Sequence, residues 1–366
     1  MMSPFALGLA QLGFSEIWDV TGRPSIALLV REKKLKSRTG IYLLRFSDDA
    51  YYIGRAVDIV RRFSQHRRIH GARIVGFAFQ KCAKKTLEAR ERDCIHLGER
   101  LGIPLSQTLD KTTVYGQADL DEIISPAEAA QWLNDPSPPA DDVERAVFNY
   151  DMGRRARDAR MLTNLSSRKD YLQLVRLLKL YVNSAIPAPR LTEHDFWNVS
   201  CLPSTNKPTW QRLFCVSAHV MELFVVGYHR NDEYRLSGFV NLAESIVVAK
   251  YPSADDLIDH FGEIDLRQGR HYLSAGYDQL QIVFSDVETA EALLRDSTIR
   301  KACAQLNYNV MRKGVNTYAK FHCSALADVI LQQELSEGSP IDMEADHNSH
   351  ERTEARTKSV RLTATT

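Results

Sequence analysis

The chain has 366 residues, of which 44% are hydrophobic and 25% are charged, and its formal net charge is +1. This composition is typical of a globular protein long enough for two domains, and no apolar run approaches the length of a membrane span. The N-terminus lacks the charged start and apolar core of a signal peptide, and the six cysteines lack CxxC spacing. The sequence therefore predicts an intracellular, cytoplasmic protein without a zinc site or a disulfide framework.

Residues 1–37 precede the strongest pattern of the chain, and we expect them to form an N-terminal extension. Residues 5–14 predict a short helix, and residues 25–30 predict a strand. Residues 31–36 form a basic run. Such a run is usually a solvated face, but the position of this one just before the strongest pattern favours contact with phosphate.

A β-hairpin followed by a basic helix is predicted between residues 40 and 66. Two apolar and aromatic runs, residues 40–44 and 51–54, flank a polar turn. If Leu44 faces Tyr52, then Tyr42 lies diagonally across from Tyr52 on the same face. In the helix that follows, Arg62 and His66 are four residues apart and share one side. These elements would bring together two phenols, a guanidinium and an imidazole; the alternative is ordinary strand aromatics beside a solvated helix face.

A third strand is predicted at residues 73–79 and a helix at residues 86–101. Glu91 falls on the apolar line of this helix, four residues from both Leu87 and Ile95. A lone carboxylate on a buried stripe is costly unless a cation or hydrogen bonds satisfy it. The alternative for Glu91 is an internal salt bridge to an arginine such as Arg62.

Positive charge is concentrated in the first part of the chain. Residues 1–110 carry 19 Lys and Arg against 11 Asp and Glu, whereas the remainder carries 28 against 35. This asymmetry indicates a polyanionic partner for the first part, bound without sequence preference. Six arginines lie between residues 55 and 73, and lysines extend the basic patch: Arg55, Arg61, Arg62, Arg67, Arg68, Arg73, Lys81, Lys84 and Lys85.

The tripeptides Gly40-Ile41-Tyr42 and Tyr52-Ile53-Gly54 give residues 38–108 a resemblance to the GIY-YIG nuclease family. The family's arginine, ten residues after the second tyrosine, corresponds to Arg62, and the histidine of some branches to His66. The basic residue after the second tripeptide corresponds to Arg55, and the metal-binding glutamate of the later helix to Glu91. Where many members have an asparagine, this chain has Ser106 or Gln107.

The resemblance implies a metal-dependent endonuclease that hydrolyses DNA with Mg²⁺ or Mn²⁺. Glu91 would hold the metal, because Glu88 reads as half of a solvated pair with Arg92. Tyr42 or Tyr52 would take a proton from the attacking water, Arg62 would stabilise charge on the phosphate, and His66 would relay a proton or contact the phosphate. Two alternatives are a non-catalytic nucleic-acid-binding or sensing protein on the same fold, and an RNA-directed nuclease. The residues expected to contact nucleic acid are Arg55, Arg61, Arg67, Arg68, Arg73, Lys84 and Lys85.

The fold predicted for the whole chain is α+β. A small nuclease-like domain at residues 38–110 would have a central antiparallel sheet flanked by helices. Residues 111–140 would form an acidic segment, with a helix at 125–134 and a Pro-rich linker at 135–139.

The second predicted domain, residues 141–336, is also α+β and resembles no family that we recognise. Helices are expected at 141–161, 169–183 and 287–304, and a strand at 279–284. Short β-like runs recur between residues 213 and 250, the last of them the sequence ESIVVAK. We expect this domain to serve targeting, regulation or assembly through a protein partner or a second copy. Residues 337–366 are polar, and we expect them to be disordered.

Overall fold

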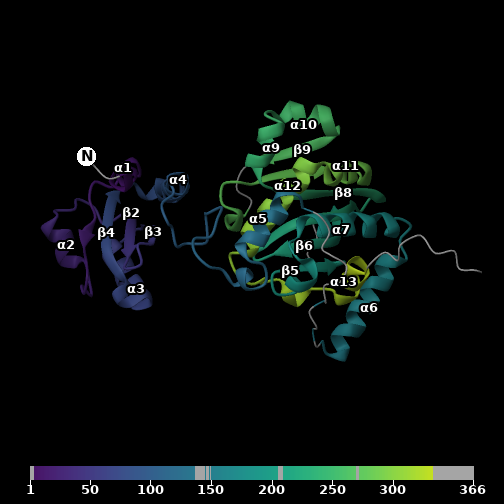
Figure 1. Cartoon of the computed structure of the whole chain (residues 1–366), viewed down its shortest axis with the longest axis horizontal. Coiled ribbons are helices and arrows are strands. Elements are labelled where there is room, and N and C mark those ends of the chain that lie inside the picture. The colour runs from purple at the N-terminus through teal and green to yellow at the C-terminus, as the bar shows by residue number, and fades with distance from the viewer. Residues whose placement is uncertain are drawn as a thin grey trace, which may run out of the picture. The chain divides into compact units, whose positions relative to one another are not determined.

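The computed structural model describes residues 4–136, 145, 148, 150–204, 209–268 and 272–332, and it confirms the predicted α+β class (Figure 1). Its strands form two antiparallel sheets, one of four strands and one of six. Of the helices in the described part of the chain, none combines the length and the apolar character needed to span a membrane. The six cysteines are all free.

The four-stranded sheet contains the predicted hairpin. Its order is β1-β4-β2-β3, so the predicted third strand is an inner strand. Leu44 pairs with Tyr52, which is the register that places both tyrosines on one face. Part of the sheet comes from residues before 38, because β1 pairs with β4. The strands are β1 (Trp18–Asp19), β2 (Gly40–Phe46), β3 (Tyr51–Ala56) and β4 (Ile74–Lys81).

Helices cover both faces of this sheet. Tyr42 and Phe63 belong to a cluster with α2 and α3, whereas Leu43 and Ile95 belong to a second cluster with α1 and α4. The strand predicted at residues 25–30 is wrong, because α2 occupies most of that stretch. Its apolar residues follow helical spacing: Leu29 is buried and Leu28 is 64% exposed. The helices are α1 (Pro4–Gln11), α2 (Ala27–Glu32), α3 (Ile59–His70) and α4 (Leu87–Arg100).

The six-stranded sheet has the order β5-β6-β7-β8-β10-β9. The predicted strands between residues 213 and 242 are confirmed, but ESIVVAK forms a helix, α9 (Glu244–Lys250). Only one face of this segment is buried, since Val247 is enclosed while Val248 is 44% exposed. The strands are β5 (Trp197–Cys201), β6 (Trp210–Ala218), β7 (Met221–His229), β8 (Asp232–Leu242), β9 (Ile264–Gln268) and β10 (Leu280–Phe284).

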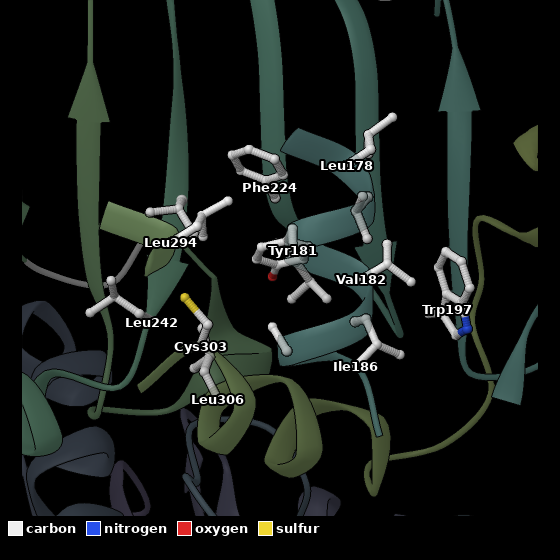
Figure 2. Close-up of a cluster of buried hydrophobic side chains, with 14 of the residues drawn as sticks. Leu178, Tyr181, Val182, Ile186, Trp197, Phe224, Leu242, Leu294, Cys303 and Leu306 are labelled. Carbon is white, nitrogen blue, oxygen red and sulfur yellow. The ribbon is translucent and has the colours of Figure 1, made fainter. Parts of the chain in front are cut away.

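The larger core lies between this sheet and the helices packed on one of its faces (Figure 2). Tyr181 of α7 stacks on Phe224 of β7 with ring centroids 4.7 Å apart. Of the helix predicted at 141–161, the part from Met152 onward is confirmed, and the Asp151 side chain caps it by accepting from the Arg154 backbone N–H. Residues 141–144, 146, 147 and 149 of this prediction lie outside the described residues. The other helices are α5 (Pro126–Asn134), α6 (Met152–Ser166), α7 (Tyr171–Ala185), α8 (Pro189–Thr192), α10 (Ala254–Phe261), α11 (Val287–Arg295), α12 (Ser297–Met311) and α13 (Ser324–Leu331).

The acidic segment before residue 137 packs with the larger core. Ser125 caps α5 as predicted, with Glu128 completing a capping box. Leu120 and Ala129 are fully buried in the cluster that contains the six-stranded sheet. Most of the predicted Pro-rich linker, and the predicted disordered tail at 337–366, lie outside the described residues.

Candidate active site

The hairpin holds the two tyrosines of the tripeptides against each other. Their rings are stacked with centroids 6.2 Å apart. Tyr42 pairs with Gly54 across the two strands, and a Cβ at Gly54 would lie 2.4 Å from the Tyr42 hydroxyl oxygen. Only glycine therefore lets the Tyr42 phenol cross β3. This close approach gives a physical reason for the last residue of the second tripeptide.

The basic helix α3 supplies both partners of the Tyr42 hydroxyl. Asp58 caps the helix by accepting from the backbone N–H groups of Val60 and Arg61, which fixes where the helix begins. One turn apart on this helix, Arg62 Nε donates to the Tyr42 hydroxyl at 3.2 Å, and His66 Nε2 lies 2.6 Å from the same oxygen. The predicted meeting of phenols, guanidinium and imidazole is confirmed.

Burial sets the charge of these groups. It raises the pKa of the Tyr42 phenol, and the neighbouring Tyr52 adds to this, against the opposing effect of Arg62. Burial also lowers the pKa of His66 to about 4, helped by the positive charge of Arg62. At neutral pH the phenol is therefore protonated and the imidazole is neutral. A neutral His66 can accept the phenolic proton through Nε2.

Glu91 reaches the same region from α4. Its side chain is 16% exposed, and Arg55 Nε lies 3.2 Å from its Oε2 atom. Burial raises the pKa of the Glu91 carboxyl, whereas Arg55 opposes this shift. The inward position predicted for Glu91 is confirmed. The arginine that pairs with Glu91 is Arg55, whereas the sequence suggested Arg62 for a salt bridge. Arg55 also contacts the exposed Glu88, at 3.3 Å.

A cleft of about 610 Å³ collects the predicted residues on one surface. One hydroxyl side chain, Ser106, and one amide side chain, Gln107, follow α4 in the chain. Gln107 borders the cleft, and its amide bonds the backbone N–H and C=O of Ile53, each at 3.4 Å. Ser106 instead donates to the Tyr51 carbonyl. Of these two side chains, Gln107 is therefore the one that borders the cleft. The residues at the cleft include Tyr52, Arg55, Arg61, Arg62, Glu91, Gln107 and Asp110.

Asp110 is the residue of this cleft that sequence reasoning missed. Its negative charge contributes to the raised pKa of Glu91. Asp110 follows the glutamate helix by ten residues in a segment without periodic pattern, and its φ of 58° is a conformation that aspartate tolerates better than most residues. No local signal in the sequence would have placed it beside Glu91.

The predicted nucleic-acid contacts fall into two groups. Arg55 and Arg61 border the cleft, and Lys84 and Lys85 line an adjoining hollow together with Arg55. Arg68, Arg73 and Arg67 are not among the residues that line either hollow. Arg73 pairs with Asp48 at 2.7 Å.

Arg67 is held by the backbone of its own fold. Its guanidinium donates to the carbonyls of Gly71, Ile74 and Val20 at 2.7, 3.0 and 2.8 Å. The same group lies over the Phe63 ring, with 5.2 Å between the guanidinium carbon and the ring centroid. This arginine ties the end of α3 to the neighbouring strand and loop.

Comparisons with known proteins identify no relative of this chain. The chain matches no family model, and no curated protein or solved structure is significantly similar to it. Any function assigned to this site therefore depends on its residues and their geometry.

The surroundings of Glu91 fit a divalent cation that keeps most of its waters. In the described part of the chain, no three His, Cys, Asp or Glu side chains converge as a metal-ligand group. Mg²⁺ is commonly bound through one or two carboxylates while keeping several waters, so a full protein cage is unnecessary. Glu91, sparsely exposed at an open cleft with Asp110 nearby, fits such a site.

Proposed function

We propose that this protein is a divalent-metal-dependent endonuclease of the GIY-YIG type that hydrolyses DNA phosphodiester bonds. One observation carries the proposal: the Tyr42 hydroxyl lies between Arg62 and His66, beside a cleft that contains both Arg62 and Glu91. A fully buried tyrosine bonded to both a guanidinium and a neutral imidazole has little purpose in packing alone. The same groups suit proton transfer next to a phosphate.

Each side chain of this site would have its own role in the hydrolysis. Tyr52 borders the cleft, whereas Tyr42 is fully buried beneath it. A phenol can take the proton of the attacking water only after it has lost its own, so the charge of Arg62 and of a bound cation would have to stabilise the phenolate first. The proton that Tyr42 gives up would pass to His66 Nε2, which lies 2.6 Å from its hydroxyl. Arg62 borders the cleft and bonds Tyr42, so its charge can stabilise both a phenolate and the phosphate in the transition state. Arg61, Lys84 and Lys85 supply phosphate contacts outside the reacting centre.

Glu91, with Asp110 nearby, would hold Mg²⁺ or Mn²⁺. A bound divalent cation supplies Lewis acidity and charge stabilisation at the phosphate. Arg55 would have to leave Glu91 when the cation enters, and its guanidinium would then be free to contact a phosphate oxygen.

The direct test uses the purified full chain with supercoiled plasmid, single-stranded DNA and RNA, each with Mg²⁺, Mn²⁺ or EDTA. We expect nicked or linear plasmid with either metal and intact plasmid with EDTA. Cleavage of RNA in preference to both DNA forms would instead support the RNA-directed alternative. Intact substrates under all conditions would refute nuclease activity.

The ion pair between Arg55 and Glu91 favours a second candidate, a nucleic-acid-binding protein without turnover. If Arg55 stays paired with Glu91, this carboxylate is not available to a cation, while Arg61 and Arg62 still border the cleft. The second candidate predicts salt-sensitive DNA binding that metal does not alter, with no cleavage.

A further inference from the structure

The face of the six-stranded sheet that is turned away from the core helices carries a row of polar side chains, of which Asn198, Ser217, Asn241 and Gln281 are buried and Glu222 is partly exposed. Asn198 of β5 pairs with Ser217 of β6, and Ser217 pairs with Glu222 of β7. The Asn241 amide donates to the Glu222 carbonyl, and Gln281 of β10 donates to Asn241. Buried polar groups cost free energy unless they find partners, so such a row is uncommon on a face that serves only packing.

A cavity of about 540 Å³ lies where the row crosses β5, β6 and β7. Its size falls in the range of sites for small molecules. Polar groups from these strands meet apolar and aromatic side chains from α6 and from the segments after β5 and before α13. The residues at the cavity include Asn198, Ser200, Ser217, Met161, Leu202 and Phe321.

Asn198 lines this cavity, and a neighbouring amide holds its side chain in place. Its side-chain oxygen accepts from the Asn316 amide at 2.8 Å, and the residue as a whole is only 1% exposed. An amide held in one orientation at a cavity offers a fixed hydrogen-bonding group, which suits a ligand with hydrogen-bonding atoms at its edge.

The charged groups at the cavity are already neutralised in pairs. Arg157 Nη2 lies 2.8 Å from Asp158, and Arg212 Nη1 lies 2.5 Å from Glu222. Because neither sign is in excess, the cavity suits an uncharged ligand. The hydroxyl of Ser200 beside Asn198 donates to the Cys215 carbonyl at 3.4 Å, and its oxygen can still accept from a ligand.

Two aromatic side chains are among the residues that line this cavity. Phe321 is 52% exposed, and Tyr318 lies next to it with ring centroids 6.5 Å apart. An exposed aromatic side chain at the mouth of a cavity provides a stacking surface for a flat ring. Together these features describe a flat, uncharged molecule with hydrogen-bonding atoms along its edge.

We propose that this cavity binds a nucleoside, with the edge of the base on Asn198 and Ser200 and its ring against Phe321. Nucleosides combine a flat aromatic base, edge acceptors and donors, and no net charge. This site is separate from the cleft beside Tyr42, and the proposal does not depend on nuclease activity.

The test measures binding of adenosine, guanosine, cytidine and uridine to the full chain by calorimetry and thermal shift. We expect at least one nucleoside to bind with a Kd below about 100 µM and to raise the melting temperature. Ribose, which has no base, should not bind at the same concentration. Failure of all four nucleosides at about 1 mM, or equal binding of ribose, would overturn the proposal.

Two variants assign the binding to this cavity. Phe321→Ala should weaken nucleoside binding about tenfold or more by removing the stacking surface. Its matched control is Tyr115→Ala, because Tyr115 is also 52% exposed and is not among the residues lining this cavity. A folded Asn198→Ala variant should also bind the nucleoside more weakly than the normal chain. If Phe321→Ala and Tyr115→Ala bind the nucleoside alike, the proposed site is wrong.

Discussion

The two sheets each bury a tyrosine completely, and the two tyrosines have different surroundings. Tyr42 in the four-stranded sheet bonds an arginine and a histidine, which carry or can carry charge. Tyr181, on α7 against the six-stranded sheet, bonds the neutral amide of Asn307. Burial raises the phenol pKa in both cases. A buried, hydrogen-bonded tyrosine is thus compatible with packing or with chemistry, and its partners distinguish the two.

The largest effect expected in the first sheet is the loss of the metal ligand. Glu91→Gln should reduce metal-dependent plasmid cleavage by about 10³-fold or more, because charge stabilisation by a cation contributes several kcal/mol. DNA binding, measured without metal, should remain within a few-fold of normal.

Glu88→Gln is the matched control for this variant. Glu88 lies one turn earlier on α4 and also contacts Arg55, but its side chain is 65% exposed. We expect this variant to change the cleavage rate by less than about tenfold. Equal losses for the two variants, or full activity of Glu91→Gln, would remove Glu91 from its assigned role.

The comparison of the two tyrosines can be tested directly. Tyr42→Phe should lower the cleavage rate by about 10²-fold at saturating protein, with little change in DNA affinity. Tyr181→Phe removes the same oxygen from the larger core. It should lower the free energy of unfolding by about 1 kcal/mol in urea titrations and leave the rate unchanged. Similar rates for Tyr42→Phe and Tyr181→Phe would show that the Tyr42 site serves packing only.

Three arginines of α3 should give three different results. Arg62→Ala should lose about 10²-fold in rate even at saturating protein, because its role is in the transition state. Arg61→Ala should weaken DNA binding and reduce the salt dependence of the DNA affinity by about one phosphate contact. The cleavage rate of this variant should recover at high protein concentration. Arg67→Ala should instead destabilise the fold by about 2 kcal/mol, since three backbone carbonyls lose their donor. Rate recovery by Arg62→Ala at high protein would place Arg62 among the simple phosphate contacts.

Period-two alternation and helix spacing predicted the hairpin, its register and the meeting of Tyr42 with Arg62 and His66. These relations are local, because 24 residues separate Tyr42 from His66 and only a turn and a helix start intervene. The sequence failed where burial depends on distant neighbours. Apolar, β-branched residues at 244–250 form a helix, and Arg67 binds carbonyls as far along the chain as Val20. Such long-range partners leave no periodic signal in a single sequence.

The smallest effect expected concerns the charge of His66. Its pKa in the folded chain is about 4, below the ordinary value near 6.5, mainly because burial disfavours the charged ring. The unfolded chain therefore takes up a proton at this residue as the pH falls below about 6.5, while the folded chain does not until about pH 4. The stability associated with neutral His66 is complete above pH 6.5 and is lost progressively between these two values.

We expect this residue to contribute about 2 kcal/mol to the fall in unfolding free energy between pH 7 and pH 4. His70, which stacks on His66, also has a pKa lowered by burial and contributes with the same sign. The comparison is therefore between the normal chain and His66→Gln, whose amide cannot titrate. The pH slope of His66→Gln should be smaller, and an NMR titration of the normal chain should show the His66 ring neutral at pH 6. An ordinary midpoint near pH 6.5 in that titration would mean that His66 is not the neutral acceptor beside Tyr42.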